Sequence, residues 1–130
     1  MPAETKRAAT GVYMLFLGEQ VSEADLLATM HRYQQSAADE QVGSYSVVID
    51  PIKLKNPLKM ARLVAKHTDA HTMRYVVVES GRQGSVLVER LAQKLPDVTI
   101  EVMPTQTSAL NRAKDLQGVA DEDSAACDYL

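Results

Sequence analysis

Four apolar runs, each followed by a segment of helical period, constrain the fold of this chain more than any other feature of its sequence. The runs are residues 11–17, 45–49, 74–79 and 98–103. In the third run, Val76, Val77 and Val78 form a β-branched stretch that suits a strand buried on both faces. Because strands alternate with helices, we expect an α/β fold with βαβ crossovers and a mainly parallel sheet.

Each run is followed by a helix-start signal. Ser22 precedes Asp25 by three residues, a spacing that resembles a capping box, and Asn56 stands directly before a proline. Gly118 fits the residue after the last helix. The expected N-caps are Ser22, Asn56, Ser85 and, for the last helix, Thr107 or Ser108.

The length of 130 residues is that of one domain. Residues 11–118 carry the alternating pattern, so we expect them to form a single α/β domain. Residues 1–10 are polar and predict a flexible N-terminal segment, or at most a marginal edge strand. Residues 119–130 are acidic and small, which is typical of a disordered tail.

Charge and cysteine content narrow the class of protein. A net charge of −3 gives no overall electrostatic argument for binding nucleic acid or an anionic membrane. The single cysteine, Cys127, has no internal disulfide partner, which favours a reducing compartment. No stretch approaches the roughly 20 apolar residues of a membrane helix, and the N-terminus lacks the apolar core of a secretory signal. We therefore expect a cytoplasmic protein without an integral membrane segment.

The turn between the third run and its helix is the first candidate ligand site. Its residues are Ser80, Gly81, Arg82, Gly84 and Ser85. Backbone N–H groups at a helix start, with glycines that allow close approach, suit a phosphate or carboxylate. The spacing matches neither a P-loop nor a dinucleotide-binding fingerprint. The other interpretation is a glycine-bearing βα connection with a serine cap.

Asp50 ends the second run, where a carboxylate suits phosphoryl acceptance or metal binding. Such chemistry also needs acidic partners after the first run, and that position offers only Glu19. An aspartate before Pro51 is also an ordinary turn residue. We therefore keep Asp50 as a tentative ligand-binding residue beside the turn interpretation.

Basic side chains repeat along the second expected helix. Lys55, Lys59, Arg62 and Lys66 recur at spacings of four, three and four, which places them on one face. Such a stripe suits an acidic partner or a lipid head group. It is also what the solvated face of an amphipathic helix looks like.

The sequence contains few motifs that would indicate a catalytic or metal site. His67 and His71 are spaced as zinc ligands on a helix, but His31 is the only other histidine, and a helix end that favours histidine is the simpler interpretation. No nucleophile elbow is present, and Cys127 lies in the expected tail. We expect no catalytic residue, no metal site and no cofactor.

Several of these segments together resemble a known family. They are G-E at 18–19, V-S-x-x-D-L from Val21 to Leu26, and S-V-V-I-D at 46–50. These are similar to segments of STAS (anti-sigma-factor-antagonist) domains, nearest to the small stand-alone SpoIIAA-like branch. T-I-E-V-M at 99–103, with S-A-L at 108–110, looks like the closing strand and helix of that family.

The resemblance implies a four- to five-stranded sheet with helices mostly on one face, and a binding role in place of catalysis. Phosphorylated STAS proteins carry an aspartate-serine-serine-glycine segment where the second helix begins. Residues 55–58 read K-N-P-L at that place, so the family's serine is absent from it.

Three hypotheses for function remain. The one we favour is a non-enzymatic regulatory or protein-interaction domain of STAS-like fold, which acts as a homodimer and binds a regulatory protein partner. The alternative is a domain that binds an anionic or lipid-like small molecule at Ser80–Ser85. The third is an enzyme with polar groups converging near Asp50, Glu79, Ser80 and Asn56, for which the sequence names no reaction. We expect no enzyme activity and no nucleic-acid partner.

Overall fold

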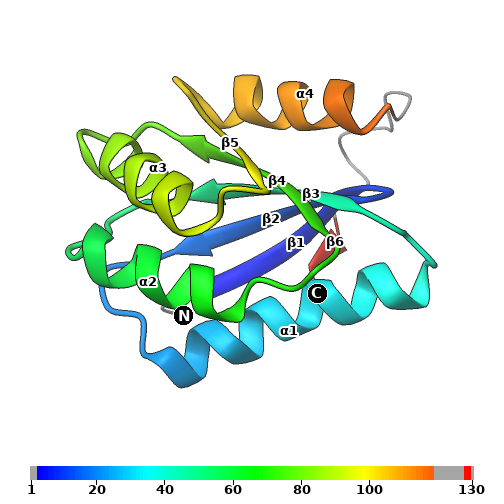
Figure 1. Cartoon of the computed structure of the whole chain (residues 1–130), viewed down its shortest axis with the longest axis horizontal. Helices are drawn as coiled ribbons and strands as arrows, with labels where there is room; N and C mark the ends of the chain where they lie inside the picture. Colours follow the sequence, from blue (N-terminus) through cyan, green and yellow to red (C-terminus); the bar gives the residue numbers. More distant parts are fainter. Residues whose placement is uncertain (1–2, 119–127, 130) are drawn as a thin grey trace.

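A mixed sheet with helices on both faces forms the body of the molecule (Figure 1). The computed structural model describes residues 3–118 and 128–129. Its strands are β1 (Ala3–Ala9), β2 (Val12–Leu17), β3 (Tyr45–Asp50), β4 (Thr72–Val78), β5 (Thr99–Met103) and β6 (Asp128–Tyr129). Its helices are α1 (Glu23–Asp39), α2 (Pro57–His67), α3 (Gln83–Lys94) and α4 (Gln106–Gln117).

The sheet has the strand order β5-β4-β3-β2-β1-β6. Strands β2 to β5 are parallel neighbours in chain order, and β1 pairs antiparallel with β2. Each crossover therefore steps to the next strand in the same direction, which keeps the three crossover helices on one face. The predicted α/β fold with a mainly parallel sheet is confirmed.

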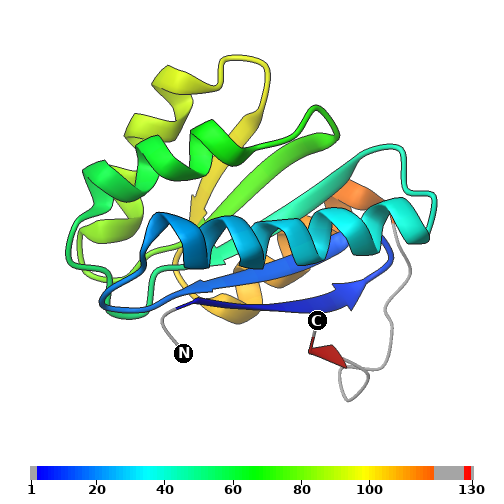
Figure 2. The same ribbon diagram turned by 90° about the horizontal axis from the view of Figure 1, so that it is seen from below.

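Helices α1, α2 and α3 cover one face of the sheet, and α4 covers the other (Figure 2). α2 packs between α1 and α3. α4 follows the last parallel strand and packs its buried Ala109 and Ala113 against Val48 and Val76 on the opposite face. The arrangement that the resemblance implied, with most helices on one face of the sheet, is therefore confirmed. None of the helices in the described part of the chain is long and apolar enough to cross a membrane.

Local signals set three of the four helix starts. The Ser22 hydroxyl accepts a hydrogen bond from the Asp25 N–H at 3.1 Å, and the Asn56 side chain accepts one from the Lys59 N–H at 3.1 Å. Both caps are as predicted. α4 instead starts from Thr105, which exchanges capping-box hydrogen bonds with Ser108.

The prediction of Thr107 or Ser108 as the N-cap of α4 is therefore wrong. Ser108 is the third residue of that helix, and its hydroxyl accepts from the Thr105 N–H at 3.1 Å. Gly118 ends the helix in the left-handed conformation, with φ of 72°, as expected for its type.

The N-terminal segment also differs from the prediction. Ala3–Ala9, expected to be flexible or at most a marginal edge strand, forms β1, with Ala3 opposite Leu17. The Thr5 hydroxyl donates to the Met14 carbonyl at 2.6 Å, and the side chains of Ala8 and Ala9 are buried. A flexible segment is therefore wrong for these residues, because hairpin pairing with β2 satisfies their backbone groups.

The expected disordered tail lies mostly outside the described residues, which omit 119–127 and 130. Its described part, Asp128–Tyr129, is a short strand that pairs antiparallel with Lys6 and Arg7 of β1. Those two residues therefore depart from the prediction of a disordered tail.

Candidate functional site

The predicted Ser80–Ser85 turn does connect β4 to α3, but its serine has another role. α3 begins at Gln83, so Ser85 lies inside the first helical turn, and Arg82 stands at the N-cap without a side-chain cap bond. The Ser85 hydroxyl donates a hydrogen bond to the Glu79 carboxylate. The prediction of Ser85 as N-cap is therefore wrong, because the N-cap lies three residues earlier, at Arg82.

Gly84 serves helix–strand packing in this turn. A Cβ atom at Gly84 would lie 2.7 Å from the Val78 carbonyl oxygen and 2.9 Å from the Glu79 Cα. Gly81 supplies the left-handed turn, with φ of +62°. The Glu79 carboxylate stands beside the first turn of α3, where a bound anion would meet its negative charge. This geometry argues against a phosphate or carboxylate site at the turn.

Asp50 is directed to the other face of the sheet. Its neighbour Ile49 belongs to the core under α1–α3, so by strand alternation Asp50 points toward α4. There its carboxylate accepts a hydrogen bond from the Gln106 side chain at 2.9 Å. The Asp50 side chain therefore points to the face of the sheet opposite to α3.

The histidine pair does not converge either. The His67 Nε2 atom lies 3.0 Å from the Glu23 carboxylate, whereas the His71 Nδ1 atom lies 3.0 Å from the Gly43 carbonyl oxygen. Among residues 3–118 and 128–129, no group of three or more histidine, cysteine or acidic side chains is placed to hold a metal ion. Cys127 lies outside the described residues.

The predicted basic stripe divides into two parts. Lys55 forms an ion pair with Glu19, and Lys66 forms one with Glu23 at 2.8 Å. Hydrogen bonds from these lysines lower the pKa of both glutamates. The charges of Lys55 and Lys66 are thus compensated within the chain, whereas Lys59 and Arg62 form no ion pair with any residue from 3 to 118.

Lys59 and Arg62 line a groove together with two basic side chains of α3, Arg90 and Lys94. A groove of about 480 Å³ between α2 and α3 is lined by Asn56, Leu58, Lys59, Arg62, Arg90 and Lys94. We call it the basic groove. No acidic side chain lines it, and within residues 3–118 none of its four cations takes part in an ion pair. Leu58 adds an apolar side chain that is 50% exposed.

Sequence reasoning missed Arg90 and Lys94. Their spacing of four residues on α3 places them on one helix face, a signal that the sequence does contain. The periodicity of the sequence does not show that α2 and α3 are neighbours in the fold. α2 and α3 lie side by side because they follow adjacent parallel strands, β3 and β4.

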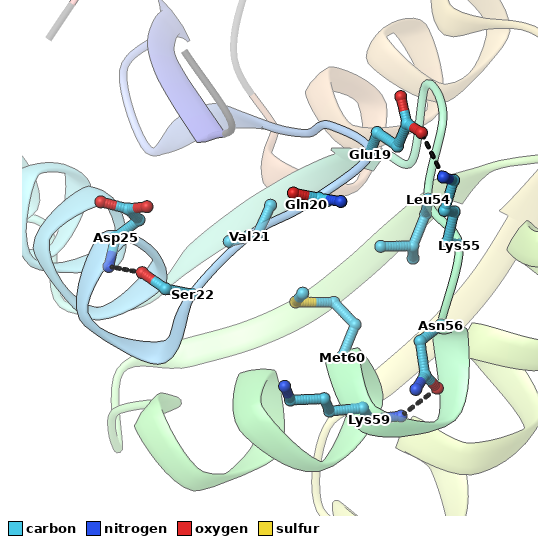
Figure 3. A pocket seen from close by; sticks show the side chains of 10 residues that line it. All are labelled: Glu19, Gln20, Val21, Ser22, Asp25, Leu54, Lys55, Asn56, Lys59 and Met60. Atoms are coloured by element: carbon cyan, nitrogen blue, oxygen red, sulfur yellow. Dashed lines mark hydrogen bonds and ion pairs between the residues drawn. The ribbon is translucent and has the colours of Figure 1, made fainter.

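A second hollow lies where β2 and β3 end, and we call it the strand-end pocket (Figure 3). It holds about 480 Å³ between the loop before α1 and the loop before α2. Val21, Leu54 and Met60 give it an apolar lining that is almost fully buried. Its polar lining comprises Glu19, Gln20, Ser22, Asp25, Lys55, Asn56 and Lys59.

Comparison with known proteins adds no family to this picture. No family model, no curated protein and no solved structure matches the chain. The architecture itself is shown: an α/β fold whose parallel strands continue into an antiparallel β1–β2 hairpin. The STAS family stays a prediction from the sequence.

Proposed function

We propose that this chain is a non-enzymatic protein-interaction domain of STAS-like fold, which binds an acidic segment of a partner protein through the basic groove. One observation carries the proposal: four cations line the groove, and none of them is ion-paired within residues 3–118. The whole chain has a net charge of −3, so this positive charge is a local feature. Such a patch attracts and orients an acidic partner.

The groove favours a protein segment because it combines charge with an apolar anchor. Like charges around one groove repel each other, and carboxylates from a partner would relieve that repulsion. Leu58 is half exposed at the same groove, where a partner's apolar side chain would cover it. An acidic segment that also carries apolar side chains matches both features.

A binding titration tests this function. A short fluorescein-labelled peptide of glutamate and leucine is titrated with the protein at low salt, where charge interactions are least screened. The double variant Arg62→Gln/Arg90→Gln should weaken binding about tenfold, since each exposed charge pair contributes up to about 1 kcal/mol. Lys66→Gln is the matched control on the same helix, because Lys66 is paired with Glu23. Equal affinity of wild type and double variant would refute the proposal.

A lipid surface is the competing partner. Vesicles with and without phosphatidylserine are therefore tested beside the peptide, with the same variants. If the anionic vesicles bind through Arg62 and Arg90 while the peptide does not bind, the proposed protein partner is wrong. Peptide binding without vesicle binding supports it.

Homodimerisation and a cytoplasmic location complete the proposal. Leu27 on α1 and Ile52 before α2 are 46% and 51% exposed, which gives a second copy apolar side chains to cover. Light scattering should give twice the mass of one chain; a single-chain mass in dilute solution removes the dimer from the proposal. The single cysteine supports a reducing compartment.

A further inference from the structure

We propose that two copies of this chain join through the free edge of β5, so that their sheets continue into one another across a two-fold axis. This deepens the homodimer of the proposed function, on which it rests, and assigns the contact to β5 in place of the surface around the exposed Leu27. β5 ends the sheet on the side opposite to β6, and β4 is its only neighbour in the described part of the chain (Figure 1). Such an edge strand offers backbone groups to a further strand.

The hydrogen bonds of β5 show which of its backbone groups point outward. The Glu79 N–H donates to the Met103 carbonyl at 2.8 Å, so the main-chain groups of Met103 face β4. Because these groups alternate along a strand, those of Ile100 and Val102 face away from β4. Across residues 3–118 and 128–129, no hydrogen bond outside the sheet ladder reaches them. Each of these two residues thus leaves one N–H and one C=O group for a new strand.

The two edges of the sheet differ in how they are protected from further pairing. β1 carries three charged residues, has a register irregularity between Arg7 and Ala9, and pairs with β6. Charges, bulges and covering segments are the usual means of blunting an edge. β5 has an unbroken register with β4, and its single charged side chain, Glu101, is bonded to Arg112 of α4 at 3.0 and 3.2 Å. The outer edge of β5 is therefore open to a further strand.

A second copy is the occupant because the edge of β5 complements itself. With Glu101 on the two-fold axis of an antiparallel pair, Ile100 of each copy lies opposite Val102 of the other. Both residues direct their main-chain groups outward, so each opposite pair exchanges two N–H···O=C hydrogen bonds. Val102, which is 39% exposed, then packs beside an Ile100 that contacts the core under α1–α3. Such cross-strand pairs of β-branched residues stabilise a sheet.

The charges at the axis agree with this pairing. The two Glu101 side chains would meet on the face of the sheet that α4 covers, and two like charges alone would repel each other. Each copy also brings the Arg112 that already binds its own Glu101. The contact therefore holds two anions and two cations, with no net charge, which favours association.

The mass in solution tests the contact. Light scattering should give the wild type twice the 14.3 kDa of one chain. Val102→Lys places a charge at the edge and should weaken the dimer about tenfold, whereas Val102→Thr keeps a β-branched residue there and should retain the dimer. Leu27→Lys, on α1, should also retain it. Circular dichroism confirms that each variant is folded. An unchanged dimer in Val102→Lys would overturn the proposal.

Amide hydrogen exchange, followed by nuclear magnetic resonance, locates the contact at single residues. In the wild-type dimer the N–H groups of Ile100 and Val102 should exchange slowly, because each is bonded to the second copy. In Val102→Lys the Ile100 N–H should exchange about tenfold faster or more, while those of Glu101 and Met103, which face β4, stay protected. Fast exchange at Ile100 and Val102 in a wild-type dimer would contradict the contact at β5.

The same variants separate this inference from the proposed function. A dimer that is lost in Leu27→Lys and kept in Val102→Lys would refute the contact at β5 and leave the homodimer standing. A wild type with the mass of one chain would refute both. Val102 does not line the basic groove, so Val102→Lys should still bind the acidic peptide, and failure at the edge leaves that binding untouched.

Discussion

Four tyrosine side chains meet in the core between the sheet and helices α1–α3. Tyr13 stacks on Tyr33 with ring centroids 5.9 Å apart, and Tyr45 meets both rings edge-on. The Tyr75 hydroxyl lies 2.6 Å from the Thr68 hydroxyl. All four rings are fully buried, so ionising any of them would place a charge in the core.

Because these tyrosines are buried, we expect the free energy of unfolding to fall at alkaline pH. Burial is the main cause that raises the pKa of Tyr13 and Tyr75 to about 12, whereas an unfolded tyrosine ionises near pH 10. The stability they contribute is complete below about pH 10. It then falls by about 1.4 kcal/mol per pH unit for each tyrosine up to about pH 12.

Urea unfolding followed by circular dichroism at about pH 8, 10 and 11 measures this loss. Tyr75→Phe should reduce the slope above pH 10, because it removes one of the buried hydroxyl groups. A free energy of unfolding that is independent of pH across this range would contradict the prediction.

Gly84 should resist substitution for packing reasons. In Gly84→Ala, the new Cβ would lie 2.7 Å from the Val78 carbonyl oxygen, and strand and helix must separate to admit it. We expect a loss of about 1–3 kcal/mol, although alanine is the better helix former by about 1 kcal/mol. Gly43→Ala is the control, since nothing lies within 4 Å of its Cβ position. Thermal unfolding measures both; equal melting temperatures would contradict the packing role.

The same turn shows where residue-level prediction stops. The sequence correctly predicted a turn after the β4 run, but it placed Gly84 and Ser85 before the helix, and both lie inside α3. Ser85 was predicted as the cap because serine is one of the preferred N-cap residues. The Ser85 hydroxyl instead donates a hydrogen bond to the Glu79 carboxylate, and α3 starts at Gln83. Where the chain turns is set by the packing of Gly84 on β4, which no local pattern contains.

At the scale of elements, α2 depends on its asparagine cap. The Asn56 side chain accepts from the Lys59 N–H at 3.1 Å, and Pro57 fixes the first helical residue. Asn56→Ala should cost about 1 kcal/mol of unfolding free energy in a urea titration. The control variant Asn111→Ala, on the exposed face of α4, should not lower the unfolding free energy. Equal losses in the two variants would show that the cap does not matter.

Elements with local signals were predictable, and β1 was not. The apolar runs of β2, β3 and β4 and the caps at Ser22 and Asn56 are visible within a few residues of sequence. Ala3–Ala9 reads A-E-T-K-R-A-A, with charge in its middle and small side chains at its ends. It is a strand because β2 offers it a partner, with Ala3 opposite Leu17 and Thr5 opposite Leu15.

At the scale of the whole molecule, strand order creates the proposed binding surface. Consecutive parallel strands bring α2 beside α3, so two cations from each helix line one groove. Periodicity alone shows which residues share a face of one helix, but not which helix lies next to it. The basic stripe predicted from the sequence therefore contains Lys59 and Arg62, which line the groove. It also contains Lys55 and Lys66, which form ion pairs within the chain. It lacks Arg90 and Lys94, which belong to the neighbouring helix.

The most direct measurement of the central claim is a nuclear magnetic resonance titration of the isotope-labelled protein with the glutamate–leucine peptide. If the basic groove is the binding surface, the amide signals of residues 58–62 on α2 and 90–94 on α3 should shift together and saturate. Raising the salt concentration should reduce the shifts, because the attraction is electrostatic. Saturating shifts confined to another surface, such as residues 80–85, or no saturation at the groove, would contradict the account.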